Sequence, residues 1–253
     1  MNSLTFQPLV PVFDANIGVG HRHDRIAPFT DSSQLLEEMG RHGVSRALVY
    51  HVQGETRGVL NANETLFSWV ENQPSLYPQW MITPSIDCLK QLEQLHSENQ
   101  VSCVRLSNTI ECKLPFVEWL YNDLLVWLSE KKIPLWISLA DTLPLEIMET
   151  LSHFPNLVSV LVGAHYSHSP LIRPFLQRLP NSYIELSRFE GLGKVAELKT
   201  EFGTKRFIYG SFYPRYAMGP TLFFVHQLGL SQSELESFCA GNLENILGME
   251  TLI

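Results

Sequence analysis

The chain has 253 residues, of which 45% are hydrophobic and 17% charged, and its formal net charge is −8. This composition is typical of a globular protein with a large core and excludes the disordered class, which has few apolar residues. Lysine and arginine are scattered along the chain. This argues against nucleic acid and anionic membranes as partners, because both are bound through basic patches.

The cysteines and the N-terminal segment bear on the compartment. The four cysteines form no CxxC pair and have no zinc-type histidine spacing, so we interpret them as reduced thiols. Residues 1–12 contain no basic stretch followed by a long apolar run, and no apolar run approaches the ~20 residues that a membrane-spanning helix needs. The sequence therefore predicts a cytoplasmic protein.

Short β-branched or aromatic runs alternate with helical patterns along the whole chain, which is typical of βαβ units and a parallel sheet. The expected strands are 9–16, 45–51, 77–83, 101–106, 133–140, 157–162, 182–186 and 206–211. The expected helices lie between Asp31 and Gly43 and at 63–71, 86–98, 116–131, 145–154, 171–179, 195–202, 220–228 and 231–247.

Three local patterns support these assignments. Asp31 is a good N-cap residue for the first helix. The segment 133–140 is almost wholly apolar, as a strand that is buried on both faces must be. Ser231 and Glu234 have the spacing of a capping box at the last helical region.

Eight strands with intervening helices predict an α/β protein that folds as a (β/α)8 TIM barrel. No linker or charge run divides the chain, so we expect one domain over residues 1–253. An open, doubly wound sheet is the alternative, because a strand count does not establish closure.

Three groups of segments resemble the amidohydrolase superfamily, in particular its aminocarboxymuconate-decarboxylase-like branch. FDANIGVG at 13–20 resembles the first strand of that family, and SQLLEEMGRHGVSRALVYH at 33–51 resembles its first helix and second strand. RFIYGSFYPRYAMG at 206–219, followed by LSQSELESFCAGNLENILG at 230–248, resembles the last strand and the terminal helix. The resemblance implies a TIM barrel whose reactions are usually assisted by a metal ion.

The chain departs from the family pattern at the metal ligands. The two histidine positions of the first strand hold Asn16 and Gly18, and the fifth-strand histidine position holds Ser138. Phe212 stands in place of the aspartate of the eighth strand, whereas His165 lies near the histidine position of the sixth. Because Gly and Phe cannot bind a metal, and Asn and Ser are poor replacements for imidazole, we expect no metal ligands of the usual kind.

In barrel enzymes the chemistry lies at the C-terminal ends of the strands, so we take the candidate residues from there. For proton transfer the candidates are His165, Glu185 and Tyr213. For substrate binding they are Asn16, His51, Arg105, Ser138, His168, Arg188 and Arg215. This set is polar and partly cationic, which suits an anionic ligand held by guanidinium groups.

Two of these candidates have a structural alternative. Arg105 ends an otherwise apolar strand, and an ion pair with Glu185 explains it as well as ligand binding does. His168 is explained better by hydrogen bonds to the backbone than by catalysis. His21 and His23 form an HxH pattern beyond the first strand, which we interpret as part of a loop or lid rather than a metal site.

The first functional hypothesis is an amidohydrolase-like hydrolase or related lyase that acts on a small carboxylate or lactone-type substrate without the usual metal. The second is an inactive barrel that binds or senses a small molecule. A third, metal-dependent hydrolase requires His21, His23, His165 and His168 to converge. We expect no cofactor, with a weakly bound divalent metal near His165 as the remaining option, and a small-molecule partner; homo-oligomerisation stays open.

Overall fold

The computed structural model describes residues 6–24, 26–56, 58–189 and 191–249, apart from the side chain of Leu192. Its strands are β1 (Phe13–Val19), β2 (Arg46–His51), β3 (Leu76–Pro78), β4 (Trp80–Ile82), β5 (Val104–Leu106), β6 (Leu135–Ser138), β7 (Ser159–Val162), β8 (Ser182–Glu185) and β9 (Phe207–Ile208). Every strand pair is parallel, in the orders β1-β2-β3 and β4-β5-β6-β7-β8-β9.

Backbone hydrogen bonds join the two sheets into a closed barrel. β3 and β4 are halves of one strand that is interrupted at Gln79, whose N–H donates to Val49 O at 2.8 Å. At the other junction, Ala15 N donates to Tyr209 O at 3.2 Å and Gly18 N to Tyr213 O at 2.7 Å. With β3 and β4 counted as one strand, the barrel therefore has eight strands within the described residues, and the predicted (β/α)8 fold is confirmed.

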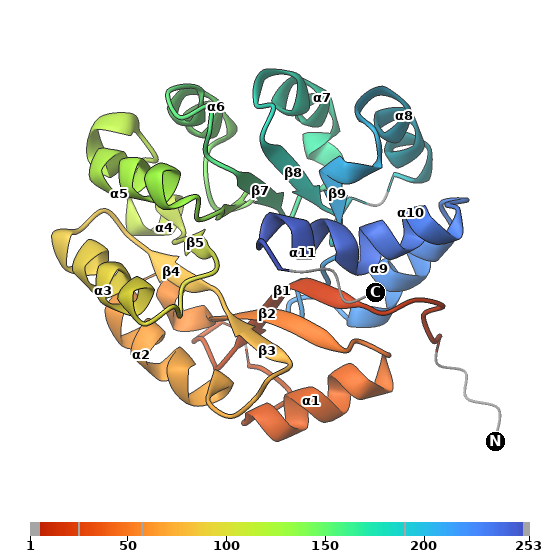
Figure 1. Cartoon of the computed structure of the whole chain (residues 1–253), viewed down its shortest axis with the longest axis horizontal. Coiled ribbons are helices and arrows are strands. Elements are labelled where there is room, and N and C mark those ends of the chain that lie inside the picture. The colour runs from red at the N-terminus through yellow and green to blue at the C-terminus, as the bar shows by residue number, and fades with distance from the viewer. Residues whose placement is uncertain (1–5, 25, 57, 190, 250–253) are drawn as a thin grey trace.

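Helices surround the barrel (Figure 1). They are α1 (Ser32–Arg41), α2 (Val59–Val70), α3 (Ile86–Ser97), α4 (Thr109–Cys112), α5 (Glu118–Lys131), α6 (Pro144–Ser152), α7 (Ser169–Arg178), α8 (Leu192–Phe202), α9 (Met218–His226), α10 (Gln232–Glu236) and α11 (Asn242–Ile246). Four short turns of 3₁₀ or π type are η1 (Val52–Glu55), η2 (Tyr166–His168), η3 (Thr204–Arg206) and η4 (Ser237–Gly241).

The local helix signals are found where the sequence predicts them. The Asp31 side chain accepts from Gln34 N at 2.9 Å and caps α1. Ser231 and Glu234 form the predicted capping box at α10. The sequence pattern gave no indication of the short helix α4, because its first turn is held by contacts with the next loop, where Thr109 N donates to Asp141 O.

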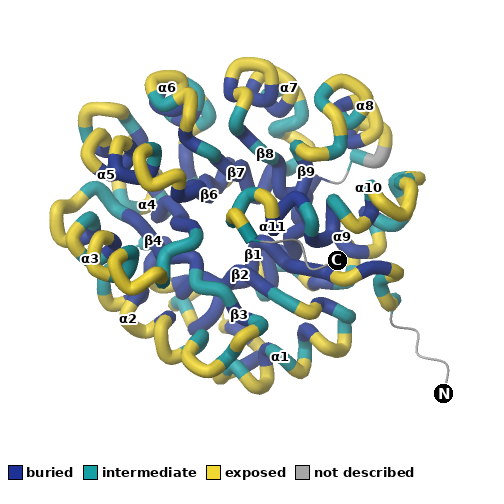
Figure 2. The backbone as a smooth tube through the Cα atoms, viewed as in Figure 1, coloured by how far each residue is buried: buried dark blue, intermediate teal, exposed yellow. Residues whose placement is uncertain are grey.

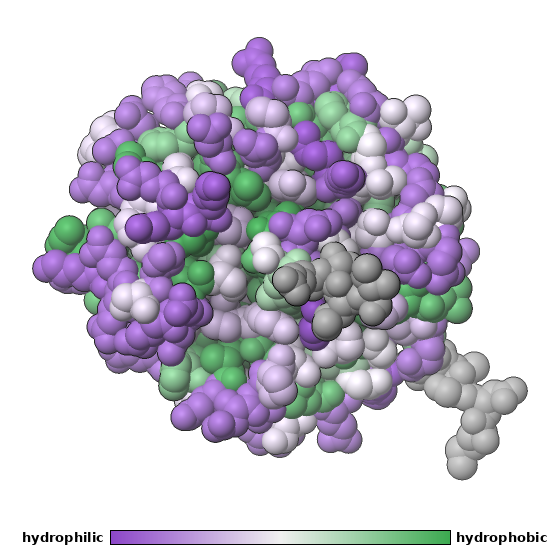
Figure 3. Space-filling model, viewed as in Figure 1, coloured by the Kyte–Doolittle hydropathy of each residue, from purple (hydrophilic) through white to green (hydrophobic). Residues whose placement is uncertain are grey.

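The barrel is buried on both faces of its strands, and the outer faces of the helices are exposed (Figure 2). One apolar cluster fills the space between strands and helices, and a second fills the N-terminal part of the barrel interior with Phe13, Leu48, Trp136 and Ile208. The face in this view carries mostly hydrophilic side chains over the outer helices (Figure 3). None of the helices in the described ranges is long and apolar enough to cross a membrane.

The C-terminal helices close the N-terminal end of the barrel. Asn242 Nδ2 donates to Thr204 O at 2.9 Å and to Phe207 O at 2.7 Å, where β9 begins. Glu244 pairs with Arg46 at the start of β2. The polar side chains of a functional site are therefore expected at the opposite end of the barrel, where the strands end.

Candidate functional site

Arg105 lies in the barrel interior on β5 and is 1% exposed. Its Nη1 donates to Asn16 Oδ1 at 3.1 Å and to Gln79 Oε1 at 3.2 Å. The Tyr50 ring faces the guanidinium, with its centroid 4.0 Å from Cζ. Among the described residues no carboxylate pairs with Arg105, and its Nη2 has no hydrogen-bond partner. Arg105 is therefore a buried cation that neutral groups hold in place.

Glu185 ends β8 and is fully buried. Its Oε1 accepts from Ser187 N at 2.6 Å, and its Oε2 accepts from Ser187 Oγ at 2.8 Å and Asn16 Nδ2 at 3.1 Å. Burial raises the pKa of Glu185 to about 7, although the hydrogen bonds from Ser187 and Asn16 oppose that rise. Gly210 is required here, because a Cβ at that position would lie 2.4 Å from Glu185 Oε1.

Asn16 connects the cation to the carboxyl group, because its carbonyl accepts from Arg105 while its amide donates to Glu185. Asp14 holds the backbone of this part of β1: its Oδ1 accepts from Asn16 N and from Ser211 N, both at 2.9 Å. Burial raises the pKa of Asp14 to about 6. We call Asp14, Asn16, Arg105 and Glu185 the barrel centre.

Phe212 fills the space beside the barrel centre. A Cβ at Gly163 would lie 3.1 Å from Phe212 Cε1 and 3.9 Å from Ser138 Oγ, so the phenyl ring occupies the room that a side chain at position 163 would need. Phe212 has a φ of 56°, which is a strained conformation for a bulky side chain. Its ring centroid lies 5.6 Å from Arg105 Cζ and 5.2 Å from Arg215 Cζ.

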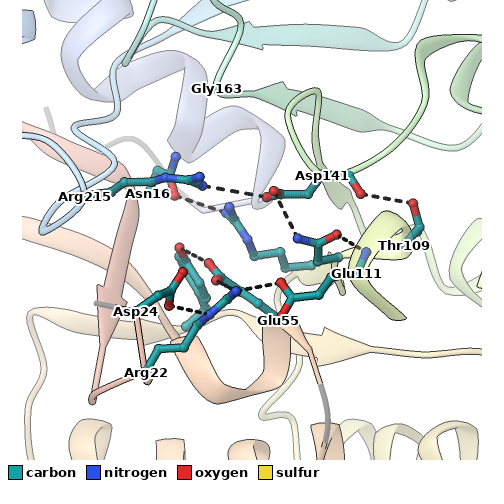
Figure 4. A network of polar contacts seen from close by, with 12 residues as sticks. Asn16, Arg22, Asp24, Glu55, Thr109, Glu111, Asp141, Gly163 and Arg215 are labelled. Atoms are coloured by element: carbon teal, nitrogen blue, oxygen red, sulfur yellow. Dashed lines mark hydrogen bonds and ion pairs between the residues drawn. The ribbon is translucent and has the colours of Figure 1, made fainter. Parts of the chain in front are cut away.

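Charged side chains from the loops form a network of ion pairs near Asn16 of the barrel centre (Figure 4). Arg22 pairs with Asp24 at 2.8 Å, with Glu55 at 2.8 Å and with Glu111 at 2.6 Å, and its side chain is only 8% exposed. Arg215 lies 4.0 Å from Asp141. We call this group of pairs the cover.

His51 lies beneath the loop that carries the cover. A Cβ at Gly20 would lie 2.3 Å from His51 Nε2, and Gly20 has a φ of +79° that suits glycine. Burial, with the nearby charge of His21, lowers the pKa of His51. His51 Nδ1 and Ser138 Oγ are buried and have no hydrogen-bond partner among the described residues.

The structure thus brings together Asn16, Arg105 and Glu185 at the barrel centre, with Ser138 beside Phe212 and Arg215 in the cover. It places three other predicted residues elsewhere. His165 caps the turn η2, where its ring centroid is 3.8 Å from that of Tyr166. His168 Nδ1 accepts from His165 N, a backbone bond of the kind expected for it. Tyr213 stacks on Phe29 at 5.7 Å.

The environment of Tyr213 is that of a packing residue. Burial raises the pKa of Tyr213 to about 12, with a smaller contribution from Glu38 of α1. Arg188 is half-buried beside Tyr216, with its Cζ 4.7 Å from that ring centroid. The roles predicted for His165 and Tyr213 therefore receive no support from the contacts that these side chains make.

Several residues of the site were missed by sequence reasoning. Gln79 is a polar residue inside an apolar strand, and that interruption was the available signal. Asp14 stands at the aspartate of the Asp-x-His-x-His pattern that the first strand resembles, and that position was its signal. Ser187 and the Arg22–Glu55 pair had no distinct pattern, because their roles depend on how loops bring distant segments together.

The family's metal site does not fit these residues. Asn16 is occupied by Arg105 and Glu185, Ser138 offers only a hydroxyl, and Phe212 offers no donor. A Cβ at Gly18 would lie 2.7 Å from Val52 Cγ1, so that position has no room for a ligand side chain. Within the described ranges no three His, Cys, Asp or Glu side chains are grouped to hold a metal ion, so the four histidines that a metal-dependent hydrolase requires do not converge.

Solved structures with the same fold cover almost the whole chain. No family model matches the sequence, and no curated relative matches it. The 5-carboxyvanillate decarboxylase of Sphingomonas paucimobilis is 13% identical, with a TM-score of 0.74 over 95% of this chain and 100% of its own. A dihydroxybenzoic acid decarboxylase of Polaromonas sp. JS666, solved with bound manganese, is 12% identical, with a TM-score of 0.74 over 95% and 97%.

A third structure carries the family name that the sequence suggests. It is an amidohydrolase 2 of Bifidobacterium longum subsp. infantis, 16% identical, with a TM-score of 0.66 over 95% of this chain and 100% of its own. The resemblance of the chain to amidohydrolase 2 proteins is thus confirmed at the level of the fold, which is a (β/α)8 barrel.

Proposed function

We propose that the chain is a carboxylate-acting enzyme, a hydrolase or a lyase, whose substrate binds at the barrel centre. The observation that carries the proposal is the state of Arg105. It is a buried guanidinium with an unpartnered Nη2 and no carboxylate partner among the described residues. A buried cation without a counterion is costly, and a carboxylate ligand would supply both the missing charge and the missing acceptor.

Glu185 is the proton-transfer group of this proposal. A pKa of about 7 leaves the carboxyl group present in both protonation states near neutral pH, which suits an acid or a base. Ser187 and Asn16 fix its orientation. In our scheme Arg105 binds the carboxylate or the developing oxyanion of a small carboxylate or lactone-type substrate. Glu185 donates a proton to the substrate or accepts one from it.

The fold also supports this choice of substrate class, because two of the similar structures are decarboxylases of carboxylic acids. The chemistry assigned here uses only the chain's own residues. Arg22 and its carboxylate partners come from loops at the same end of the barrel, so we expect substrate entry to require movement of the cover.

A catalytically inactive barrel that binds a small molecule is the second candidate. Phe212 favours it, because the ring fills the space between Gly163 and Ser138 where the family pattern has ligand-bearing side chains. Both candidates require the carboxylate to bind at Arg105, and only the first requires turnover.

The test is to titrate the protein with a panel of small mono- and dicarboxylates and to measure their affinities by isothermal titration calorimetry. The Arg105→Met variant should weaken the best ligand roughly 10- to 100-fold, because a hydrogen bond to a charged group contributes about 1.5–3 kcal/mol. Arg173→Met is the matched control, since Arg173 lies on the exposed outer helix α7.

Turnover separates the two candidates. Lactones, esters, amides and carboxylates are incubated with the chelator-treated protein, and products are measured by chromatography. Product formation that is lost in Glu185→Gln supports the enzyme, whereas binding without any product supports the inactive barrel. Equal affinity in wild type and Arg105→Met would rule out the barrel centre as the site.

A further inference from the structure

A cavity lies beside the barrel centre, on the same end of the barrel. It has a volume of ≈ 410 Å³ and lies between the loop after β8 and the start of α9. Its walls are mainly hydrocarbon, from Leu186, Phe189, Tyr216, Pro220 and Phe224. We call it the rim pocket. Its volume falls within the range of small-molecule sites, which are mostly apolar with a few polar groups.

Arg188 is the cation beside the rim pocket. Its Cζ lies 4.7 Å from the ring centroid of Tyr216, which is one of the pocket walls. The Arg188 side chain has no ion pair or hydrogen bond among the described residues, and its Nε is buried without a partner. Burial, followed by the charges of His165 and Arg188, lowers the pKa of His168, so His168 lies within reach of the Arg188 charge.

The rim pocket is separated from the barrel centre by Ser187. The N–H and Oγ of Ser187 donate to Glu185, and its carbonyl accepts from Thr221 Oγ1 at 3.1 Å. These bonds use the polar atoms of Ser187 and hold the wall in place. The cation available to a ligand in the rim pocket is therefore Arg188, and the cation of the barrel centre is Arg105.

An apolar cavity with one unpaired guanidinium at its edge matches a ligand with a hydrocarbon body and a single carboxylate. Water in an apolar cavity gains few hydrogen bonds, so a hydrocarbon group displaces it favourably. The carboxylate gives Arg188 the acceptors that the protein does not provide, through paired N–H···O bonds. The described residues of the pocket walls include no cation, so a dicarboxylate or a phosphate ester would have only Arg188, beside the wall residue Tyr216, to meet its charge.

We propose that the rim pocket is a binding site for a small amphiphilic monocarboxylate, with its hydrocarbon body between Phe189 and Phe224 and its carboxylate on Arg188. The proposal is independent of the function assigned to the barrel centre. It adds a second ligand site to the molecule, and the two sites have different cations and different walls.

The experiment uses the full chain and 6,6,6-trifluorohexanoate, with the fluorine NMR signal as the readout of binding. The uncharged control compound is 6,6,6-trifluorohexanol, which has the same hydrocarbon chain. We expect saturable binding of the carboxylate and much weaker binding of the alcohol. Arg188→Met should weaken the carboxylate roughly 10- to 100-fold and leave the alcohol unchanged, because only the ionic hydrogen bonds are lost.

Two further variants locate the ligand. Ala217 lines the pocket and is exposed, so Ala217→Trp should block binding of both compounds without disturbing the core. Arg173→Met is the charge-matched control and should bind as wild type does. Arg105→Met tests the other site: if it abolishes binding while Arg188→Met does not, the ligand lies in the barrel centre and the rim pocket is ruled out.

Three other outcomes would also overturn the proposal. They are the absence of saturable binding in the millimolar range, equal affinity for the acid and the alcohol, and wild-type affinity in Arg188→Met. None of them bears on the barrel centre, whose own test is the effect of Arg105→Met on the carboxylate panel and on turnover.

Discussion

The barrel centre and the cover above it handle charge in opposite ways. In the cover, Arg22 touches three carboxylates directly, at 2.6–2.8 Å. In the barrel centre, Arg105 meets Glu185 only through the amide of Asn16. The two regions are connected, because the Tyr50 ring lies on Arg105 while the Tyr50 hydroxyl donates to Glu55 of the cover at 2.9 Å.

The difference shows which charges remain available to a ligand. A directly paired guanidinium has its charge neutralised by the protein, and it serves to hold loops together. A guanidinium that is held by an amide and an aromatic ring has no counterion from the protein, so a bound anion gains the whole electrostatic interaction with it. The comparison therefore assigns binding to Arg105 and closure to Arg22.

The largest effect is expected when the amide bridge is removed. Asn16→Ala deletes the acceptor of Arg105 and the donor to Glu185, and both charged groups remain buried. We expect a loss of roughly 3 kcal/mol or more in the free energy of unfolding, because each hydrogen bond to a charged group contributes about 1.5–3 kcal/mol. Urea denaturation measures it, and exposed Asn122→Ala is the control.

Arg22→Met is the matching change in the cover. Asp24 and Glu111, two partners of Arg22, are 47% and 41% exposed, so solvent replaces part of what is lost. We expect a cost of about 1–2 kcal/mol that becomes smaller with added salt, whereas the cost of Asn16→Ala is insensitive to salt. Equal costs with equal salt dependence would contradict the distinction between the two regions.

A second prediction concerns the protonation of Glu185. Its pKa is about 7 in the folded chain against an ordinary value of 4.5. The folded state therefore binds more protons than the unfolded state between these values. The stability that this proton contributes is complete below about pH 4.5 and is lost as the pH rises through about 7. The loss is roughly 3–4 kcal/mol, at about 1.4 kcal/mol per pKa unit.

Glu185→Gln should remove roughly half of the total decrease in stability, which denaturation at a series of pH values measures. The other half comes from Asp14, whose pKa is raised from 3.8 to about 6 and has the same sign. Glu201→Gln, at an exposed glutamate paired with Arg173, is the control and should leave the wild-type pH profile unchanged. An unaltered profile in Glu185→Gln would show that Glu185 stays ionised in the folded chain.

Sequence reasoning predicted the parts of this molecule that depend on regular geometry. Alternating strands and helices indicate parallel strands whose C-terminal ends converge, so Asn16, Arg105 and Glu185 could be grouped before the fold was known. Which of these three side chains contact one another could not be predicted. The register of β1 shifts between Asp14 and Ile17, and this irregularity is what turns the Asn16 amide toward both charged groups.

The candidates on loops were predicted less well, because a loop position does not determine a direction. His165 lies past the end of β7 and turns into η2, where it caps its own loop. Tyr213 follows Phe212, whose left-handed backbone turns the chain out of the strand, and its ring lies against Phe29 instead of the barrel centre. Phe212, one of the positions where the chain departs from the family pattern, is also the residue whose backbone redirects Tyr213.

Phe212 connects the two regions, since its ring centroid lies 5.6 Å from Cζ of Arg105 in the barrel centre and 5.2 Å from Cζ of Arg215 in the cover. Loss of this buried ring should cost about 3–5 kcal/mol in either Phe212→Ala or Phe212→Gly. The smallest predicted effect is the difference between them. At a φ of 56°, glycine avoids a strain of roughly 1 kcal/mol that alanine retains, so Phe212→Gly should be the more stable variant.

Phe207 provides the matched control, because it is equally buried and has a φ of −123°. There the order should reverse, with Phe207→Ala about 0.5–1 kcal/mol more stable than Phe207→Gly, since glycine loses more backbone entropy on folding. Both pairs are measured by urea denaturation. If alanine is the better residue at both positions, the backbone at Phe212 is not strained and the ring is held there by packing alone. If the orders differ, the chain tolerates a strained backbone in order to keep an aromatic ring between its two guanidinium groups.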